Sequence, residues 1–516
     1  MKRSAILAKI DRLRDGSPPR VLDLFSGCGG LSLGFKSAGF EIAGAVESDP
    51  HAAASHGWNF HPDDENHAIP RSMESNPSEI ALALGLAPPE QGVDVLIGGP
   101  PCQAFTRIGR PKLRDIQNHP EAYKHDPRAR LYQRYLEYIS AFKPLAILME
   151  NVPEVIRFGS RNIPEEVSEV LEESGYTCAY TLLNAAHYGV PQYRERMFLV
   201  AYRKELDVDV TFPRPTHRAD LPKGYRDHRK GMLEKLVCTD LLGSRYHAVL
   251  PPLSYADLPQ AVTVEQAIHD LPVVSGETVD RVVEFGFRAL GTQRLYDKRR
   301  RVSEYAQMLK DWEGFAGGAG VSDHVIRSLP RDWRIFAGMK EGDRYPDAVR
   351  LAEKLFEREL TRLRKTTSRK YRYGKLVDEL RRTFVPPYPV DKFPDKWRKL
   401  ARSEPSHTVT AHLGKDCYSH IHYDDGQART ISVREAARLQ SFPDGFEFKG
   451  PMNAAFRQIG NAVPPLMAKA LAGEMLGALT GYVSGAMEEG IIGKRAKELM
   501  EESGIYRKEA ACDSGY

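Results

Sequence analysis

Short apolar runs alternate with amphipathic segments along the first part of the chain. Each run is rich in β-branched residues and too short for a buried helix, so it predicts a strand covered on both faces, as in a parallel sheet. The expected strands are 21–25, 41–46, 93–97, 145–149 and 176–183, and the expected helices are 4–14, 78–85, 131–142 and 164–174. Strands that alternate with helices in this way predict an α/β domain.

The first predicted strand runs directly into a glycine-rich turn, SGCGG at 26–30, and then into a helix. This order opens nucleotide-binding α/β domains. The turn is not the dinucleotide fingerprint of a dehydrogenase, because Ser32 replaces its third glycine, and no Gly-Lys-Ser/Thr follows to make a phosphate loop. Glu47 ends the second strand, where an acid grips ribose hydroxyls in this architecture. A solvated loop carboxylate is the alternative.

Later strand ends carry further reactive groups. Cys102 lies in GGPPCQAFT (98–106), after a strand, and its thiol is either a nucleophile or a small buried apolar group. Glu150 follows the next strand and is a candidate general acid, or else a capping or salt-bridged carboxylate. Arg194 and Arg196 share one face of an extended segment. They point either toward an electronegative ligand or into an edge-strand ladder of ion pairs.

Composition narrows the class of protein. The chain of 516 residues is 41% hydrophobic and 28% charged with a formal net charge of +4, which is ordinary for a globular protein of two or three domains. Its six cysteines include no Cys-x-x-Cys pair, which disfavours a zinc site or a disulfide framework and suits a reducing cytoplasm. The N-terminus lacks the core of a secretory signal, and no apolar run is long enough to span a membrane.

Positive charge is concentrated in the middle of the chain. Residues 281–400 carry a formal net charge of about +12, with basic, tyrosine-containing segments at 294–302 and 360–375. Such a region supplies phosphate contacts and base-edge readers. A solvated helix face is the alternative, because 346–364 has the spacing of an amphipathic helix. Strands are expected again over 408–423.

Six motifs, in order, resemble those of the DNA cytosine-5 methyltransferases. DLFSGCGGLSLGF (23–35) is similar to the cofactor loop of that family, and GGPPCQAFT is similar to its nucleophile loop. Its two base-holding motifs are matched by MENV (149–152) and QYRERMF (192–198). Its two closing motifs are matched by RTISVREAARLQSFPDGFEF (429–448) and QIGNAVPP (458–465). The helix within 431–446 is expected to brace the small domain, and its arginines are candidates for buried ion pairs.

The resemblance implies a role for each motif residue. Cys102 would add to carbon 6 of cytosine, while Glu150 holds ring nitrogen 3 and the exocyclic amine. Arg196 would hold the 2-oxo group, and Arg194 would support the nucleophile loop and Glu150. The methyl donor would be S-adenosyl-L-methionine, which becomes S-adenosyl-L-homocysteine, with no metal. The implied cofactor-binding residues are Phe25, Gly27, Gly29, Glu47, Ile69, Pro101, Leu131, Asn461 and Ala462.

One position departs from the family pattern. The family has an Asp-Ile pair whose acid reads the adenine amine, but this sequence has Ala68-Ile69. Ile69 can still pack on the ring, and Asp63, Asp64 and Glu65 are the nearby candidates to replace the acid. In the basic middle, DNA contacts are expected from Arg299, Arg300, Arg301, Arg369 and Lys370.

The expected fold is α/β, a Rossmann-like S-adenosylmethionine-dependent methyltransferase domain with a second, smaller target-recognition domain. The catalytic and cofactor domain is expected to begin with residues 1–205 and to resume at 451–480. The remaining divisions are a target-recognition region at 206–400, the closing motif of the small domain at 401–450 and a charged tail at 481–516.

The expected function is that of a DNA (cytosine-5-)-methyltransferase that flips its target base out of double-stranded DNA. The expected setting is a bacterial restriction-modification system, with a monomer in the cytoplasm, nucleoid-associated when on DNA, and a cognate restriction endonuclease that acts separately. Two alternatives stay open. An RNA cytosine-5 methyltransferase is disfavoured by the long basic middle, and a non-catalytic DNA-binding relative is disfavoured by the presence of all four catalytic residues.

Overall fold

The computed structural model describes residues 5–101, 127–157, 162–237, 247–253, 256–276, 293–366 and 374–485. The chain divides into two compact units. The first comprises Met1–Gly189, Arg194–Gln260 and Ala462–Tyr516, and the second comprises Val190–Tyr193 and Ala261–Asn461. The first unit therefore takes its last segment from the far end of the chain. The functional division into domains stays a prediction.

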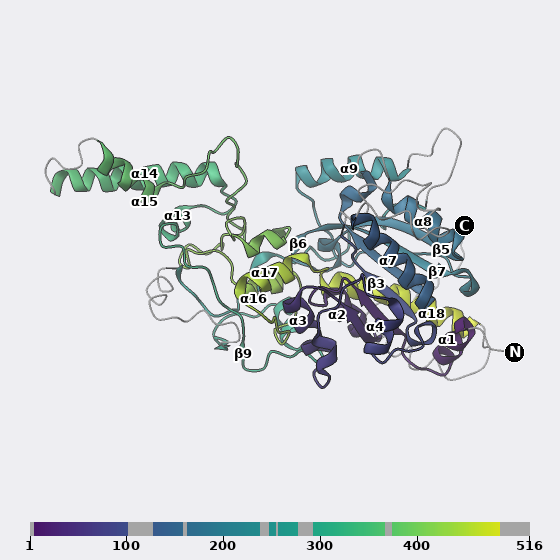
Figure 1. The fold of residues 1–516 in the computed structure, drawn as a ribbon. Helices are drawn as coiled ribbons and strands as arrows, with labels where there is room; N and C mark the ends of the chain where they lie inside the picture. The colour runs from purple at the N-terminus through teal and green to yellow at the C-terminus, as the bar shows by residue number, and fades with distance from the viewer. Residues whose placement is uncertain are drawn as a thin grey trace, which may run out of the picture. The chain divides into compact units, whose positions relative to one another are not determined.

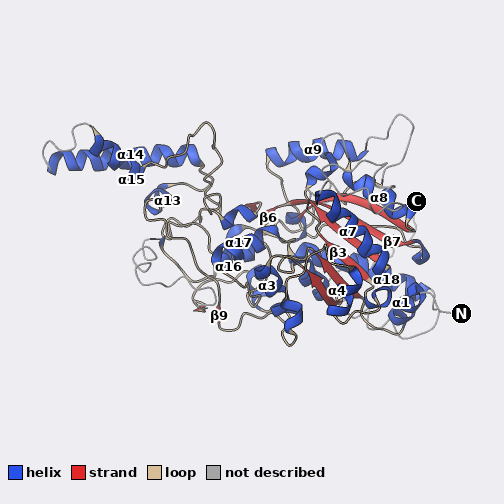
Figure 2. Ribbon diagram, viewed as in Figure 1, coloured by secondary structure: helices blue, strands red, loops and turns tan. Residues whose placement is uncertain are grey.

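The first unit is built on a six-stranded sheet in the order β2-β1-β3-β4-β7-β5 (Figure 2). Neighbours from β2 to β4 are parallel, whereas β7 is antiparallel to both β4 and β5. The predicted α/β sheet is confirmed. Its strands are β1 (Arg20–Leu24), β2 (Glu41–Val46), β3 (Val95–Gly98), β4 (Ala146–Asn151), β5 (Tyr176–Asn184) and β7 (Glu195–Arg203).

Helices pack on this sheet in two groups (Figure 1). α2 packs along α18, whereas α4 and α5 contact α7. Leu22, Leu96 and Ile147 on three adjacent strands are fully buried, as expected for strands covered on both faces. The helices are α1 (Ala5–Arg14), α2 (Gly30–Ser37), α3 (Pro50–Phe60), α4 (Pro77–Ala83), α5 (Pro89–Gly92), α7 (Pro127–Phe142), α8 (Ile163–Glu173), α9 (Lys223–Val237) and α18 (Pro465–Gly485).

The second unit consists mostly of short helices and turns. Its described strands form two short pairs, β10 with β6 and β8 with β9. The predicted amphipathic helix at 346–364 is confirmed as α14, which packs on α15. The elements are β6 (Gln192–Tyr193), α10 (Val264–Ile268), β8 (Arg294–Leu295), α12 (Glu304–Lys310), β9 (Gly320–Val321), α13 (Trp333–Gly338), α14 (Tyr345–Thr366), α15 (Lys375–Phe384), β10 (Ser406–His407), α16 (Val433–Leu439) and α17 (Met452–Asn461).

The strands predicted over 408–423 are wrong. This segment holds a 3-10 turn at Ala411–Gly414, and Ile421 makes only isolated bridges, to Lys399 and Thr430. The aromatic and β-branched residues that suggested strands are buried among turns instead. The exposure of its polar residues does not follow one strand period, because Thr410, His412 and Lys415 are exposed whereas His420 and His422 are at most 1% exposed.

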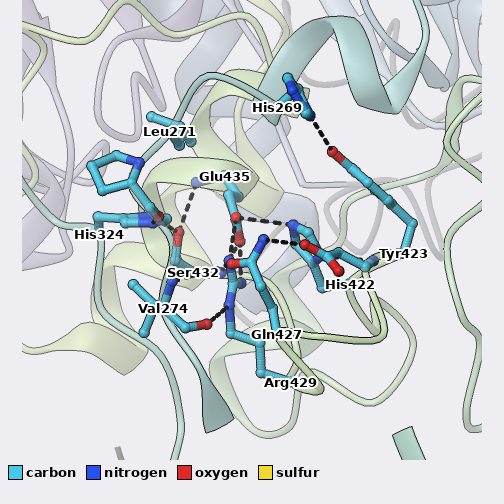
Figure 3. Close-up of polar contacts among 12 residues, drawn as sticks. His269, Leu271, Val274, His324, His422, Tyr423, Gln427, Arg429, Ser432 and Glu435 are labelled. Carbon is cyan, nitrogen blue, oxygen red and sulfur yellow. Dashed lines mark hydrogen bonds and ion pairs between the residues drawn. The ribbon is translucent and has the colours of Figure 1, made fainter. Parts of the chain in front are cut away.

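Buried ion pairs hold α16 and its flanks in place (Figure 3). Glu435 joins Arg429 through two contacts of 2.6 and 2.7 Å, and its side chain also caps α16 at Ser432. Arg438 lies between Asp270 and Asp444, and all three side chains are fully or almost fully buried. The predicted buried ion pairs are therefore confirmed. No helix of the described ranges is long and apolar enough to cross a membrane.

Candidate active site

The carboxyl ends of β1, β3 and β4 meet at one edge of the sheet. Leu24 pairs with Gly98, and Gly98 pairs with Met149, so the turns that follow begin at the same level. Parallel neighbours always place equivalent ends together, and open α/β sheets bind their ligands there. Three of the predicted motifs therefore share one edge of the first unit.

The glycine turn after β1 has a constrained backbone. Phe25 has a φ of 59°, which is uncommon for a residue other than glycine, and its N–H donates to the carbonyl of Val46 (2.9 Å). Gly29 has a φ of 101°, and a Cβ there would overlap the ring of Phe60. Dihedral angle and space therefore both require glycine at this position.

Glu47 is fixed against this turn, where the sequence places it. Its two carboxylate oxygens accept hydrogen bonds from the N–H groups of Gly27 (2.9 Å) and Asp49 (2.7 Å). The carbonyl of Glu47 accepts from the N–H of Arg71 (2.7 Å), which ties the following segment to it. In that segment Ile69 is 51% exposed. An acid and an exposed apolar side chain are thus held on segments that hydrogen-bond to each other.

The three candidate replacements for the missing acid differ in their contacts. Asp64 caps the 3-10 turn Glu65–Ala68 by accepting from the N–H of Asn66 (3.0 Å), and it lies 3.7 Å from the ring of His67. Asp63 and Glu65 are exposed. The carboxylate of Asp64 is therefore already engaged in capping its own turn.

A buried polar chain supports the start of α2. The Ser32 hydroxyl donates to Asp23 (2.6 Å) and lies 2.9 Å from Nε2 of His56. Burial raises the pKa of Asp23 to about 7 and holds the pKa of His56 well below its usual value. These groups lie beneath the turn and reinforce it.

Glu150 and the two arginines come together. Arg196 Nε lies 2.9 Å from a carboxylate oxygen of Glu150, and both side chains are about one-seventh exposed. Arg194 is 1% exposed. Burial and then Arg196 lower the pKa of Arg194, whereas Glu150 and Tyr225 raise it. The structure thus brings together an acid and two cations in a mostly buried cluster.

The segment that leads to Cys102 passes over this cluster. A Cβ at Gly99 would lie 2.8 Å from a carboxylate oxygen of Glu150. Asn151 donates to the carbonyl of Pro100 (2.8 Å), and Pro101 is exposed. Cys102 itself lies outside the described residues.

The cysteines that the structure does describe are poor nucleophiles. Cys28, Cys178 and Cys417 are buried and unpaired, and burial raises the pKa of each thiol above its usual value. A thiol that stays protonated is inert. None of the three is therefore a competitor for the role predicted for Cys102.

The remaining predicted residues are spread over both units. Leu131 lies on α7 and is half-buried against the core of the sheet. Ala462 is buried in the first unit, whereas Asn461 is the exposed last residue of α17 in the second. Within the ranges that the structure covers, no group of three or more His, Cys, Asp or Glu side chains is placed to hold a metal ion.

The predicted DNA contacts lie in the second unit. Arg299 is exposed and pairs with Asp297 (3.0 Å), whereas Arg300 donates to the carbonyl of Leu271 (2.6 Å). Arg301 is exposed. Arg300 thus anchors its own loop, and the arginines on either side face solvent. Arg369 and Lys370 lie outside the described residues.

Comparison with known proteins decides the family. The sequence profile of the C-5 cytosine-specific DNA methylases matches residues 19–477. The chain belongs to this family. Among its relatives is the "Putative type II methyltransferase M.OihORF3336P" of Oceanobacillus iheyensis, 37% identical over 89% of this chain and 96% of the relative. Type II methyltransferase M.AgeI of Thalassovita gelatinovora is 31% identical over 88% of this chain and 98% of its own length.

A solved structure agrees with the fold of this cytosine-5 DNA methylase. An Escherichia coli protein described as a "putative DNA modification methyltransferase encoded within prophage" has a TM-score of 0.55 at 22% identity, covering 90% of this chain and 99% of that one. The predicted family, methyltransferase fold and enzyme class are confirmed, and DNA is the substrate class. Methyltransferases of this family generally use S-adenosylmethionine.

Several residues of the methylase's active-site edge escaped the sequence prediction. Asn151 stands in the quoted MENV motif, yet only its bond to Pro100 shows that it holds the nucleophile loop. His56 had no signal, because its partner Ser32 lies 24 residues away in the chain. Tyr225 and Arg229 come from α9, which had no counterpart among the motifs.

Proposed function

We propose that Cys102 of this methylase attacks carbon 6 of a cytosine flipped out of duplex DNA, and that carbon 5 of the same ring is methylated. The proposal is carried by the cluster of Glu150, Arg194 and Arg196 at the edge of the sheet, directly beneath the segment that leads to Cys102. Unstacking the base costs a few kcal/mol, which contacts to the flipped base offset.

The residues act on the cytosine ring in a definite order. The Cys102 thiolate adds to carbon 6 and leaves negative charge on the ring, which makes carbon 5 nucleophilic. Glu150 shares a proton with ring nitrogen 3, and Arg196 donates to the 2-oxo group, so that both stabilise the developing charge. Once carbon 5 carries the methyl group, loss of its proton to solvent water and expulsion of the Cys102 thiolate restore the aromatic ring.

The glycine turn fits S-adenosylmethionine. Glu47 is fixed beside Gly27 with lone pairs left on both oxygens for ribose hydroxyls, and Ile69 offers exposed apolar surface for the adenine. Phe25, Gly29, Pro101, Leu131, Asn461 and Ala462 complete the proposed set. When bound, the cofactor supplies an electrophilic methyl group and is left as S-adenosylhomocysteine.

We further propose that residues 206–400 choose the target sequence, with phosphate contacts from the basic segments near 299–301 and 369–370. The relatives described above are type II methyltransferases, which supports a role in a restriction-modification system. There the enzyme would act as a monomer on cytoplasmic DNA, and a cognate endonuclease would act separately.

The test is base-resolution bisulfite sequencing of DNA from a methylation-free host that expresses the chain, beside Cys102→Ala and Glu150→Gln variants. We expect methylation at one short motif with the unchanged chain only. Equal methylation by the Cys102→Ala variant would exclude the covalent route. No methylation from folded, unchanged protein would exclude the proposed activity in this host.

A further inference from the structure

Glu195 stands between the two arginines of the active-site cluster but faces away from them. Successive side chains of a strand point to opposite faces. Its side chain is 7% exposed, so a carboxylate is buried one residue from Arg194 and from Arg196. A buried carboxylate without a counter-charge is costly and attracts the nearest cations.

Helix α9 supplies that counter-charge. Arg229 donates to the carboxylate of Glu195, and its own side chain is 14% exposed. Tyr225 lies one turn earlier on the same face of α9 and is among the groups that raise the pKa of Arg194. Arg226 is exposed elsewhere on this helix. One face of α9 is therefore directed at the Arg194–Glu195 stretch.

The charges of the cluster show what Arg229 changes. Glu150 and Glu195 carry two negative charges, and Arg194 and Arg196 carry two positive ones, so these four groups balance. Arg229 gives the cluster one positive charge in excess. It also leaves Arg196 free to pair with Glu150 alone. Without Arg229, Arg196 would be shared with the carboxylate of Glu195, a residue to whose backbone carbonyl Arg196 already donates (2.7 Å).

We propose that Arg229 is a positioning residue for methyl transfer. By neutralising Glu195 it keeps Arg194 and Arg196 directed at Glu150 and at the flipped cytosine, and it preserves positive charge where the ring becomes negative on thiolate addition. This inference rests on the proposed function, because it assigns Arg229 to the same cluster.

Four variants test the assignment: Arg229→Met, Arg229→Lys, the double variant Arg229→Met with Glu195→Gln, and Lys204→Met as the control at an exposed cation outside the target-recognition region. We would measure kcat, the KM for cognate DNA and the melting temperature of each. Arg229→Met should lower kcat by about tenfold or more. The loss should stay smaller than the 10²–10³-fold loss that is typical when a donor in direct contact with the reacting group is removed. Its KM for DNA should stay unchanged.

The double variant separates charge from packing. It removes Glu195's charge together with its partner, so it should recover most of kcat, while Arg229→Lys should retain an intermediate rate and Lys204→Met the full rate. A double variant as slow as Arg229→Met, with parallel losses in melting temperature, would show a merely structural role and overturn the inference. So would an Arg229→Met variant with unchanged kcat.

Failure of the inference and failure of the proposed function give different results. If the unchanged chain methylates DNA but Arg229→Met keeps its full kcat, or the double variant is as slow as Arg229→Met, only the positioning role is lost. If the unchanged, folded chain transfers no methyl group, the proposed activity fails and the positioning role falls with it. Should Arg229→Met fail to fold, the Arg229→Lys and double variants still give the comparison of rates.

Discussion

Replacing Glu435 by glutamine tests whether buried charge holds the second unit together. Glu435 is 1% exposed, and its two oxygens contact both terminal nitrogens of Arg429 at 2.6 and 2.7 Å. One oxygen also accepts from the N–H of Ser432 (2.7 Å), and the other lies 3.4 Å from His422. Glutamine keeps the shape of the side chain but turns one acceptor oxygen into a donor.

The size of the effect follows from these contacts. The amide nitrogen of the introduced glutamine would face a donor, whichever way the amide is turned, so at least one charge-assisted bond is lost and the Arg429 cation is left without a counter-charge. Removing one partner of a buried ion pair typically costs about 3–5 kcal/mol. We expect a loss in this range, which is a large part of the roughly 5–15 kcal/mol by which a domain is stable.

The measurement must resolve the two units, because a chain of two units need not unfold in one step. Hydrogen exchange under increasing denaturant gives the opening free energy of peptides from each. In Glu435→Gln, peptides around α16 should lose about 3–5 kcal/mol, while those of β1 to β4 should not change. The control, Glu359→Gln, breaks an exposed pair with Arg362 and should cost about 0–1 kcal/mol. Equal, small losses in both variants would refute the reasoning.

Three further predictions concern the cofactor, pH and DNA. Glu47→Gln should weaken S-adenosylmethionine binding about tenfold, because one charged hydrogen-bond acceptor is lost, as calorimetry would show; unchanged affinity would remove Glu47 from the site. Burial lowers the pKa of His324 and of His420 to about 4, so between pH 4 and about 6.5 both imidazoles gain a proton when the chain unfolds. The second unit should therefore lose stability as pH falls from about 6.5 to 4, as melting curves recorded across that range would show. Stability that is flat over this range would contradict this. Changing Arg299 and Arg301 to Gln should lower the salt slope of DNA binding by about 2, since each phosphate contact adds about 0.9; an unchanged slope would place the contacts elsewhere.

The sequence predicted the catalytic half of the molecule well, for a physical reason. Strands such as 93–97 and 145–149 are apolar on both sides, and their ends are marked by glycine, proline and acidic residues, so the edge that carries Glu47 and Glu150 follows from local patterns. The sequence also placed Arg194 and Arg196 on one face, because alternate residues of a strand share a face, but it did not predict that Arg196 pairs with Glu150.

The second unit was harder to predict, because apart from α14 its described helices span at most ten residues and buried ion pairs hold part of it together. The segment 408–423 has strand-forming residues, yet its contacts are with residues outside it: Ile421 bridges Lys399 and Thr430, and His422 lies 3.4 Å from Glu435. The partner of Arg438 illustrates this: Asp270 lies 168 residues earlier in the chain. Pairings of this kind leave no local pattern. The contact between Arg229 and Glu195 was missed for the same reason.

The packing of α18 along α2 sets an order on synthesis. Roughly 430 residues separate the two helices, and at about 5–20 residues per second the ribosome needs on the order of 20–90 s to make them. Throughout that interval the emerging glycine turn lacks the helix that packs along α2. The second unit, apart from Val190–Tyr193, runs from residue 261 to 461 and is finished earlier. A premature stop codon anywhere in the second unit would thus leave every residue of the β1 to β4 edge in place but without its closing helix. A circularly permuted gene that begins at Ala462 would remove the delay.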